Sequence, residues 1–439
     1  MSILSDTADD SRARAAVKKP ASWELGEGFD TSMKICCLDP ILAPYSIPRF
    51  TALQALRRDD TVHVMALGAT ERIREWQVQK ASLGFEYAEA FPGETVEDIE
   101  PQALATRVTG WLDDTDPQAV VIAGYYYPAM RAAARWARQH GRASIFVGDS
   151  QWTDRRRIIP REWVKAWWVR RHYDAALVPG ERTAAYLTWM GFPRDRIWTG
   201  HYVVDNQAFA AGAAAARAEA AVLRVRLGVP ERYFLFVGRF ATEKNLLGLL
   251  EAYARYRTAV GRRVWGLVLV GGGPLETELR ARAQELCDVV FARFQQKDTL
   301  PAYYGLASCL VLPSVSEPWG LVVNEAMAAG LPLLLSHCCG SVPELLRSGV
   351  NGYVCDPLDI DGMARLMGVM SSDAVDVNEM GEASRQIVAQ YTPETWAQTL
   401  ADCIERTLAC KRENLGKGAF SLSPGFQLQK QGAGSQIRE

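Results

Sequence analysis

The sequence predicts an α/β protein built from two doubly wound parallel sheets. Its 439 residues exceed what a single hydrophobic core usually holds, so two domains are expected. Hydrophobic residues make up 48% of the chain, which is enough to bury a core in each domain and argues against general disorder. Short apolar runs alternate with longer amphipathic runs, a pattern typical of parallel strands joined by crossover helices.

In the first half, five apolar runs predict the buried strands of an N-terminal domain over residues 31–207. The predicted strands are 33–39, 62–68, 119–124, 143–148 and 175–180. The pattern around Ala129–Gln139 fits one of the crossover helices between them. The preceding segment, 1–30, is polar and aperiodic, so we expect it to be flexible.

An Ala/Arg-rich stretch over 208–230 predicts a helical linker, and a second domain over 231–392 follows it. The predicted strands of this domain are 233–238, 264–271, 309–313, 331–336 and 352–355. A helix over 393–411 begins at the proline of TPETW, and its short connection would let it cross back to the N-terminal domain. The tail, 412–439, is polar and again predicted to be flexible.

Charge and cysteine usage narrow the choice of partners and compartment. The chain carries 49 Lys and Arg against 51 Asp and Glu, so no strong positive field points to nucleic acid as a partner. Nine cysteines stand alone or as adjacent pairs, without the CxxC spacing of a zinc or redox site. No apolar stretch reaches the length of a signal peptide or a spanning helix, so a cytoplasmic protein is expected.

Two basic residues follow the first predicted strand of the second domain, in VGRFATEKN. In open parallel sheets, ligands bind outside the carboxyl ends of the strands, which makes Arg239 and Lys244 candidates for a binding site. A guanidinium can bind two phosphate oxygens at once and an ammonium acts as a point charge, so the pair suits a diphosphate. The alternative is a pair of solvated surface charges.

A glycine run, VGGGPLETELR, follows the next predicted strand. Gly271, Gly272 and Gly273 would let a ligand approach the backbone, although such a run is often only a tight turn. The chain lacks both GxGxxG with a later acid and GxxxxGK[ST], which disfavours a dinucleotide oxidoreductase and a P-loop ATPase. The acidic stretch DDTD (113–116) is interpreted as a solvated loop before a strand, so no metal site is predicted.

The stretch SEPWGLVVNEAMAAG (316–330) places two glutamates eight positions apart across a loop-to-helix junction. If a helix starts near Gly320, its first amides can hold an anion, and Glu325 lies about 7–8 Å further along the axis. Glu317 stays in the preceding loop. The two carboxylates could therefore hold hydroxyls at either end of a molecule with phosphates in its middle, such as a nucleotide sugar. Separately, each could be an N-cap acid or a helix-face acid.

Together, GRFATEKN, VGGGP, SEPWGLVVNEAMAAGLP and GSVPELLRSGVNGYVCDP resemble the C-terminal half of glycosyltransferase family 4. The resemblance covers 230–360 and, less strongly, 180–209. It implies two facing Rossmann-like domains, the GT-B fold, with a cleft between them. It also implies retaining, metal-independent transfer of a sugar from a nucleoside diphosphate to a hydroxyl of a glycan, a lipid-linked acceptor or a small molecule, as in polysaccharide biosynthesis. A sugar-nucleotide epimerase of the same fold and a non-catalytic binding or scaffold protein are the alternatives.

The resemblance also implies roles for individual residues. Arg239 and Lys244 match the pair that holds the donor diphosphate, Glu317 the glutamate that contacts the transferred sugar, and Glu325 the one that binds the ribose. Glu317, Lys244 and Arg239 are thereby the catalytic candidates. Donor binding would also involve Gly271, Gly272, Gly273, Trp319, Gly320 and Leu321. No cofactor is implied, and a uridine nucleotide is preferred over a guanosine nucleotide.

The chain departs from this family on the acceptor side. Many relatives have a glycine-rich loop after the first strand, where this sequence has LDPILAPYSIPRFTALQALR (38–57). Many also have a histidine after the strand that ends here in FVGDSQ, where Asp149 and Ser150 stand. Both residues are acceptor-side candidates, and Asp149 would either orient an acceptor hydroxyl or cap a helix.

A basic aromatic segment, WTDRRRIIPREWVKAWWVRRHYD (152–174), follows. On a helix from Pro160, Trp163 with Trp167 and Val164 with Trp168 fall on one side at four-residue spacings. Such a helix could rest on the anionic inner face of the cell membrane and bring the site to a lipid-linked acceptor. The alternative is that the tryptophans pack against the first domain.

Overall fold

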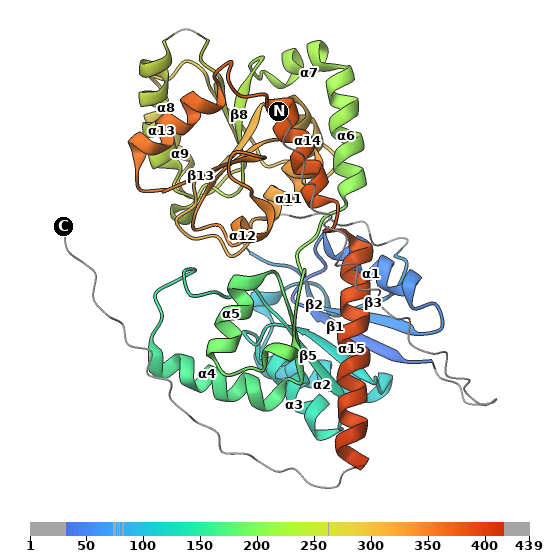
Figure 1. Ribbon diagram of the computed structural model, residues 1–439. Coiled ribbons are helices and arrows are strands. Elements are labelled where there is room, and N and C mark those ends of the chain that lie inside the picture. Colours follow the sequence, from blue (N-terminus) through green and yellow to red (C-terminus); the bar gives the residue numbers. More distant parts are fainter. Residues whose placement is uncertain are drawn as a thin grey trace, which may run out of the picture. The chain divides into compact units, whose positions relative to one another are not determined.

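A computed structural model describes residues 32–416, apart from 73–75, 77, 79, 81–82 and 262 (Figure 1). The N-terminal segment predicted to be flexible, 1–30, lies outside the described residues. The same holds for the predicted tail from 417 onward, whereas residues 412–416 form the end of the last helix.

The first sheet has seven parallel strands in the order β3-β2-β1-β4-β5-β6-β7. Their bounds are β1 (Lys34–Asp39), β2 (Thr61–Thr70), β3 (Glu86–Thr95), β4 (Ala119–Ala123), β5 (Ala143–Val147), β6 (Ala175–Val178) and β7 (Ile197–Thr199). The chain starts in the middle of the sheet, builds outward to one edge and then returns to build the other. This is the doubly wound topology.

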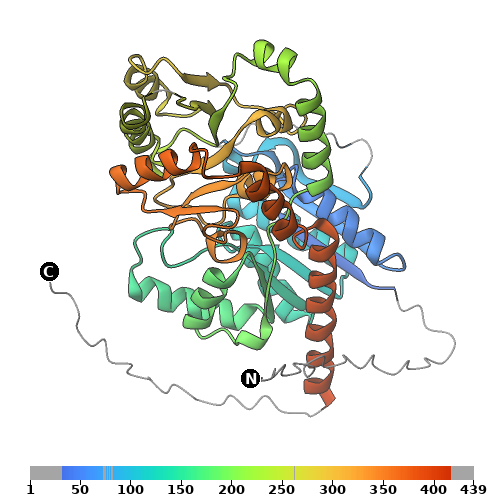
Figure 2. The same cartoon turned by 45° about the horizontal axis from the view of Figure 1, so that its top comes forward.

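Helices cover both faces of the first sheet, which is why its central strands are apolar throughout. Cys36 and Leu38 point to one face, which packs on α2 (Pro101–Thr115), α3 (Pro128–Gln139), α4 (Ile159–His172) and α5 (Glu181–Trp189). Ile35 and Cys37 point to the other, which packs on α1 (Ser46–Leu56) and α15 (Pro393–Gly416). Figures 1 and 2 show α15, in red, running alongside this sheet next to α1.

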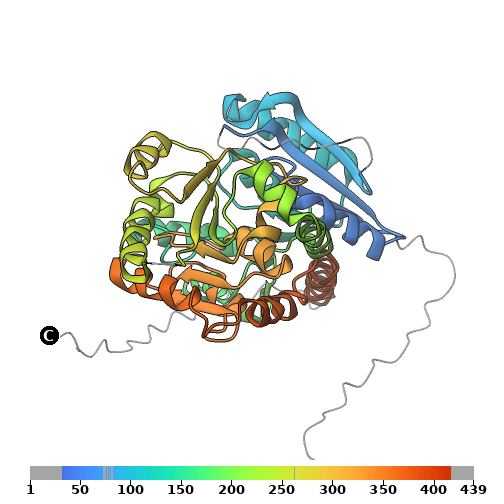
Figure 3. The ribbon, with the colours of Figure 1, turned by 90° about the horizontal axis from the view of Figure 1, so that it is seen from above.

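The second sheet has six parallel strands in the order β10-β9-β8-β11-β12-β13. Their bounds are β8 (Tyr233–Val237), β9 (Gly266–Val270), β10 (Val289–Ala292), β11 (Cys309–Leu312), β12 (Leu333–Ser336) and β13 (Gly352–Cys355). The helices of this half are α6 (Asn206–Ala218), α7 (Ala220–Leu227), α8 (Leu246–Val260), α9 (Glu276–Arg282), α10 (Leu300–Leu306), α11 (Leu321–Ala328), α12 (Val342–Leu345), α13 (Ile360–Met370) and α14 (Val377–Val388). Figure 3 shows α8 and α13 side by side against the second sheet.

The predicted α/β class with two parallel sheets is confirmed. Three strands were not predicted: β3, β7 and β10, and each is an edge strand. An edge strand is less covered than a central one and therefore needs no continuous apolar run. β3 reads EYAEAFPGET, and β7 has only three residues.

One detail of the sequence interpretation needs correction, and another becomes more specific. The acidic stretch 113–116 is not a loop before a strand, since residues 113–115 end α2 and Asp116 caps it in the left-handed conformation at φ 48°. The Ala/Arg-rich stretch is helical and forms two helices, because Glu219 separates α6 from α7.

A buried polar cluster joins α15 to the first sheet. The Trp396 side chain packs edge-on against Phe50, at 5.7 Å between ring centroids, and lies 3.2 Å from His201 Nδ1. Arg49 contacts the other ring nitrogen of His201 at 3.2 Å. Burial and the Arg49 charge hold the pKa of His201 well below its usual range, so the ring stays neutral. The cluster also fixes the start of α1, because Arg49 Nε donates to the Tyr45 carbonyl at 3.1 Å.

All nine cysteines of the chain are free thiols, including both adjacent pairs. Within the described residues, no helix is both long enough and apolar enough to cross a membrane.

Candidate active site

The site lies where the second sheet changes its direction of winding, between β8 and β11. At such a point the loops after the two strands diverge and leave room for a ligand. Lys244 ends a short 3-10 turn after β8, and Glu317 lies in the loop after β11. The structure brings them together: Lys244 Nζ forms an ion pair with Glu317 Oε2, and Glu317 is only 8% exposed.

Arg239, the other predicted cation, is not paired with Glu317. Its guanidinium donates to Glu243 Oε1 at 2.6 Å, and its side chain is 45% exposed. An exposed pair of this kind is worth only about 0.5 kcal/mol. Arg239 could therefore exchange Glu243 for a phosphate at little cost.

The glycine run after β9 is explained by backbone packing. Gly271 has φ 147°, and a Cβ there would lie 2.0 Å from the carbonyl oxygen of Gly238. A Cβ on Gly273 would come within 3.0 Å of the Phe240 backbone. Only Gly272 has space beside it, with Glu276 Oε2 as its nearest atom at 3.7 Å. The run thus brings the loops after β8 and β9 into contact, and this contact alone requires two of the three glycines.

α11 begins at Leu321, one residue after the predicted start, with Gly320 as its N-cap at φ 88°. Trp319 turns its side chain into the core, where its Nε1 donates to Asn324 Oδ1 at 2.9 Å. Any contact of Trp319 with a ligand would therefore be through its backbone. Leu321 is half-buried and lies in the first turn, where helix N–H groups have no preceding helical carbonyl to bond.

Glu325 is completely buried, and both of its carboxylate oxygens are hydrogen-bonded. Tyr45 Oη donates to Oε1 at 2.5 Å, and Tyr304 Oη of α10 donates to Oε2 at 2.6 Å. Burial raises the pKa of Glu325, opposed by these two hydrogen bonds. A buried carboxylate without partners would be energetically costly and would point to a bound ligand. Glu325 gives no such argument, because Tyr45 and Tyr304 already bond its two oxygens.

The backbone of Glu317 is held from two sides. Gly340 N–H donates to the Glu317 carbonyl at 2.9 Å, and Gln151 Nε2 donates to the same oxygen at 3.1 Å. Gly340 comes so close that a Cβ would lie 1.8 Å from the carbonyl oxygen of Pro318. Gln151 belongs to the first half of the chain, so residues from both halves position Glu317.

The acceptor-side candidates lie next to Gln151. Asp149 accepts a hydrogen bond from Tyr202 Oη at 2.8 Å. It does not cap a helix, because α4 begins only at Ile159, so that alternative is wrong. Ser150 Oγ lies 3.5 Å from Arg155 Nη2.

The predicted basic aromatic helix is confirmed as α4, but one of its tryptophans does not lie on the side that was predicted. Trp163 and Trp167 are 63% and 57% exposed, and Val164 between them is also exposed. Trp168, predicted for the same side, instead packs against Tyr173 at 5.7 Å between ring centroids. Only part of the aromatic set therefore faces solvent.

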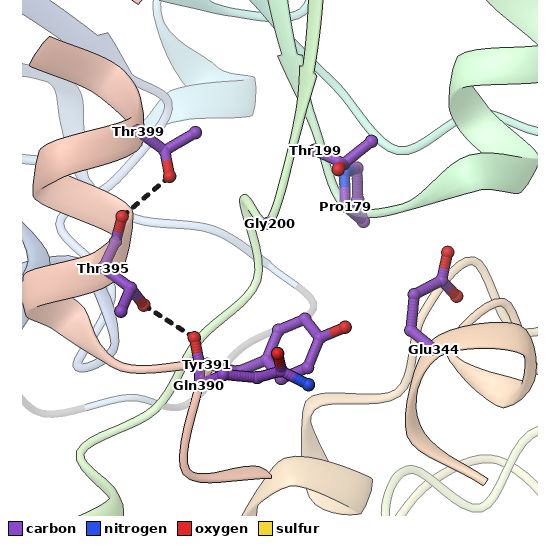
Figure 4. A pocket seen from close by; sticks show the side chains of 8 residues that line it. All are labelled: Pro179, Thr199, Gly200, Glu344, Gln390, Tyr391, Thr395 and Thr399. Carbon is purple, nitrogen blue, oxygen red and sulfur yellow. Dashed lines mark hydrogen bonds between the residues drawn. The ribbon is translucent and has the colours of Figure 1, made fainter. Parts of the chain in front are cut away.

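A pocket of about 170 Å³ lies at the connections between the two sheets (Figure 4). It is lined by Pro179, Thr199, Gly200, Glu344, Gln390, Tyr391, Thr395 and Thr399. Glu344 Oε1 accepts from the Glu181 N–H at 2.6 Å, and burial raises the pKa of Glu344. None of the predicted donor or acceptor residues lines this pocket.

Sequence reasoning missed Tyr45, Tyr304 and Gln151. Tyr304 lies in the apolar stretch LPAYYGL, so its burial could be expected, but nothing in this stretch predicts a contact with Glu325. Tyr45 and Gln151 come from the first half of the chain and carry no local signal for a contact made 280 and 166 residues later. In the described part of the chain, no group of three or more His, Cys, Asp or Glu is placed to hold a metal ion.

The part of the chain that carries this site is similar to a family of known proteins. A profile of the family described as "Glycosyl transferases group 1" matches residues 224–387, which include β8 to β13 and the site. An uncharacterized glycosyltransferase of Methanocaldococcus jannaschii is 36% identical over 141 residues, or 30% of this chain and 34% of that protein. The alpha-D-kanosaminyltransferase of Streptomyces kanamyceticus is 34% identical over 214 residues, or 48% and 54%. The chain thus spans about a third to a half of the length of these relatives.

Solved structures agree on the fold. The structure of Anabaena HepE in complex with UDP and glucose superimposes with a TM-score of 0.67 at 17% identity. The match covers 85% of this chain and 99% of HepE, so the likeness extends over both sheets. At this identity it shows the GT-B fold alone. Residues 224–387, which carry the site, are thus similar to the glycosyl transferases group 1 family.

Proposed function

We propose that the protein is a retaining, metal-independent glycosyltransferase that moves a sugar from a nucleoside diphosphate to an acceptor hydroxyl. The observation that carries the proposal is the pairing of Lys244 with Glu317 beside the N-terminus of α11. A cation, a helix N-terminus and a carboxylate meet there, with a second carboxylate, Glu325, just over one helical turn further along. Glu317 would suit the sugar, the cation and the helix N-terminus the diphosphate, and Glu325 the ribose.

Breaking the anomeric C–O bond leaves its electron pair on the diphosphate. Lys244, Arg239 and the first N–H groups of α11 are the groups that would stabilise this charge. Arg239 would turn from Glu243 to the phosphate, and Lys244 would bridge the phosphate and Glu317. Because these positive groups belong to the protein, the proposed reaction needs no metal ion or other cofactor.

Retention follows if the acceptor hydroxyl attacks the face from which the diphosphate departs. The new bond forms between the acceptor oxygen and the anomeric carbon, and the hydroxyl proton passes to the departing phosphate oxygen. Glu317 would hold a hydroxyl of the transferred sugar during this step. Asp149, which lies two residues before Gln151, is proposed to orient the acceptor.

A uridine nucleotide is the proposed donor, preferred over a guanosine nucleotide. The HepE structure contains UDP and glucose, and its fold matches both halves of this chain. The curated relatives include enzymes named for transferring different sugars, so the sugar itself is left open.

A thermal-shift series tests the proposal. UDP, GDP and ADP and their common sugars are added to the purified protein, and a ligand that binds only the folded state must raise the melting temperature. We expect a shift with UDP or a UDP-sugar that is largely lost in Arg239→Ala. Arg255→Ala is the control, because Arg255 is 44% exposed and pairs with Glu251 at the same i,i+4 spacing, although it also pairs with Asp361 at 2.7 Å.

Transfer itself is measured with the nucleotide sugar that binds. Release of nucleoside diphosphate together with a glycosylated acceptor supports the proposal. An isomerised sugar nucleotide formed without any acceptor would show an epimerase instead. Binding without turnover over a broad acceptor panel would favour a non-catalytic protein.

We also propose that α4 binds the protein to the anionic, cytoplasmic face of the cell membrane. Free thiols stay reduced on that side. The α4 patch consists of Ile158, Ile159, Trp163, Val164 and Trp167, all exposed. Five exposed arginines lie on α4 or in the segment just before it: Arg155, Arg156, Arg161, Arg170 and Arg171. The one acid of α4, Glu162, is buried and pairs with Lys165 at 2.7 Å. The patch is thus apolar and cationic, as binding to anionic headgroups requires.

The position of the patch supports a lipid-linked acceptor. Between Gln151, which bonds Glu317, and Ile158, where the patch begins, only six residues intervene. Ser316 Oγ also donates to the Asp154 carbonyl of this connection at 2.7 Å. The connection that leads into α4 is therefore anchored beside Glu317 and Ser316.

Trp163→Ser combined with Trp167→Ser is expected to reduce binding to vesicles that contain phosphatidylglycerol by at least about tenfold. Co-sedimentation measures it, with phosphatidylcholine vesicles as the neutral comparison. Val222→Ser combined with Val225→Ser is the control, since these exposed valines also lie beside arginines, on α7. Equal sedimentation of the tryptophan variant and the unmodified protein would rule the patch out as a membrane contact.

A further inference from the structure

Tyr45 is hydrogen-bonded to the carboxylate of Glu325, which the proposed function assigns to the ribose of the donor. Its hydroxyl donates to Glu325 Oε1 at 2.5 Å, although Tyr45 belongs to the loop after β1 and Glu325 to α11. Burial raises the pKa of Tyr45 well above its usual range, so the hydroxyl remains protonated and acts as the donor. The contact joins two segments that are 280 residues apart.

Tyr45 is held in place by its own neighbours. It stands directly before α1, and its carbonyl accepts from Arg49 Nε at 3.1 Å. Ser46 Oγ donates to Asp39 Oδ2 at 3.0 Å and accepts from Arg49 Nη2 at 2.9 Å. The Tyr45 ring packs edge-on against Trp76, at 5.9 Å between centroids. The backbone of this loop is thus anchored, and only the side chain of Tyr45 is left to swing.

The two tyrosines on Glu325 differ in what a ligand would have to displace. Tyr304 comes from α10 of the same half of the chain, is completely buried and bonds the other oxygen, Oε2. Glu325 itself has no exposed surface. A ribose can reach its carboxylate only if one tyrosine moves, and Tyr45, which is less buried, is the one that can.

We propose that Tyr45 is a gate on the ribose subsite: its hydroxyl takes the place of a ribose hydroxyl on Glu325 and must leave before a nucleotide sugar binds. The proposal rests on the function proposed above. Tyr304 keeps its hydrogen bond throughout and positions Glu325. Donor binding therefore releases a contact between the two halves of the chain, so Tyr45 sets the donor affinity.

The gate predicts opposite effects for two matched deletions of a hydroxyl. Tyr45→Phe removes a hydrogen bond that exists only before the donor binds, leaving a buried carboxylate oxygen without its partner until a ribose supplies one. The dissociation constant for UDP is expected to fall on the order of tenfold. Tyr304→Phe removes a hydrogen bond present in both states and loosens the carboxylate, so no gain in affinity is expected.

Isothermal titration of UDP into the full chain and both variants tests this, with melting temperatures to confirm folding. Tighter binding by Tyr45→Phe and unchanged or weaker binding by Tyr304→Phe supports the gate. Weaker or unchanged binding by Tyr45→Phe overturns it, and so does an equal gain in both variants.

The failure of the gate differs from the failure of the proposed function. If the unmodified protein binds UDP and Arg239→Ala does not, the donor site stands whatever Tyr45 does. If neither the unmodified protein nor Tyr45→Phe binds any nucleotide, the proposed function fails and the gate fails with it.

Discussion

The change Lys244→Ala is expected to lower the rate of sugar transfer by about 100- to 1,000-fold, the usual effect of removing one group that stabilises transition-state charge. Lys244 is the cation closest to the proposed sugar end of the donor, because its ammonium contacts Glu317. Its loss removes a positive charge from the departing diphosphate and also frees Glu317 to turn away. Initial rates at saturating donor measure the effect.

The same change should also destabilise the protein, because Glu317 is nearly buried and loses its ion-pair partner. The expected loss in the free energy of unfolding is about 1–3 kcal/mol. The double variant Lys244→Ala with Glu317→Gln removes the unpaired charge, so stability should largely return while transfer remains lost. This separates the structural role of the pair from its role in the reaction.

Lys411→Ala serves as the control, since Lys411 pairs with Asp174 at 2.7 Å and is about as exposed as Lys244, but lies on α15. It should leave transfer unchanged. Turnover close to that of the unmodified protein in both Lys244→Ala and Glu317→Ala would remove the basis of the proposed mechanism.

The central strands were predictable because burial on both faces gives them a continuous apolar sequence. β8, β11 and β12 read YFLFV, CLVL and LLLS, and each was found within one or two residues of its observed bounds. The edge strands β3 and β10 were not found. Their residues are half-exposed in many positions, so neither a continuous run nor a clean alternation marks them.

The half of the site on the second sheet was predictable for a related reason. Lys244 and Glu317 follow parallel strands, and the carboxyl ends of neighbouring parallel strands share one edge, so strand assignment alone brings them close. The contacts of Tyr45 and Gln151 were not predictable. They depend on how the loops of one sheet meet the loops of the other, which no periodicity in the sequence records.

The second large effect is expected from the substitution of Gly340 by alanine. Gly340→Ala would place a Cβ 1.8 Å from the carbonyl oxygen of Pro318, which is backbone and cannot rotate away. The loop that carries Glu317 must then shift, and the hydrogen bond from Gly340 N–H to the Glu317 carbonyl is disturbed. A displacement of about 1 Å in a catalytic group typically costs on the order of 100-fold in rate. Overpacking should add about 1–3 kcal/mol of destabilisation.

Transfer kinetics and thermal unfolding of Gly340→Ala measure the two effects together. Gly110→Ala is the matched control, because a Cβ there meets no atom within 4 Å and the position lies inside α2, where alanine is favoured over glycine. This control should be slightly more stable than the unmodified protein and equally active. If Gly340→Ala were as active as Gly110→Ala, the position of the Glu317 loop would not limit the reaction, and the role proposed for Glu317 would have to be given up.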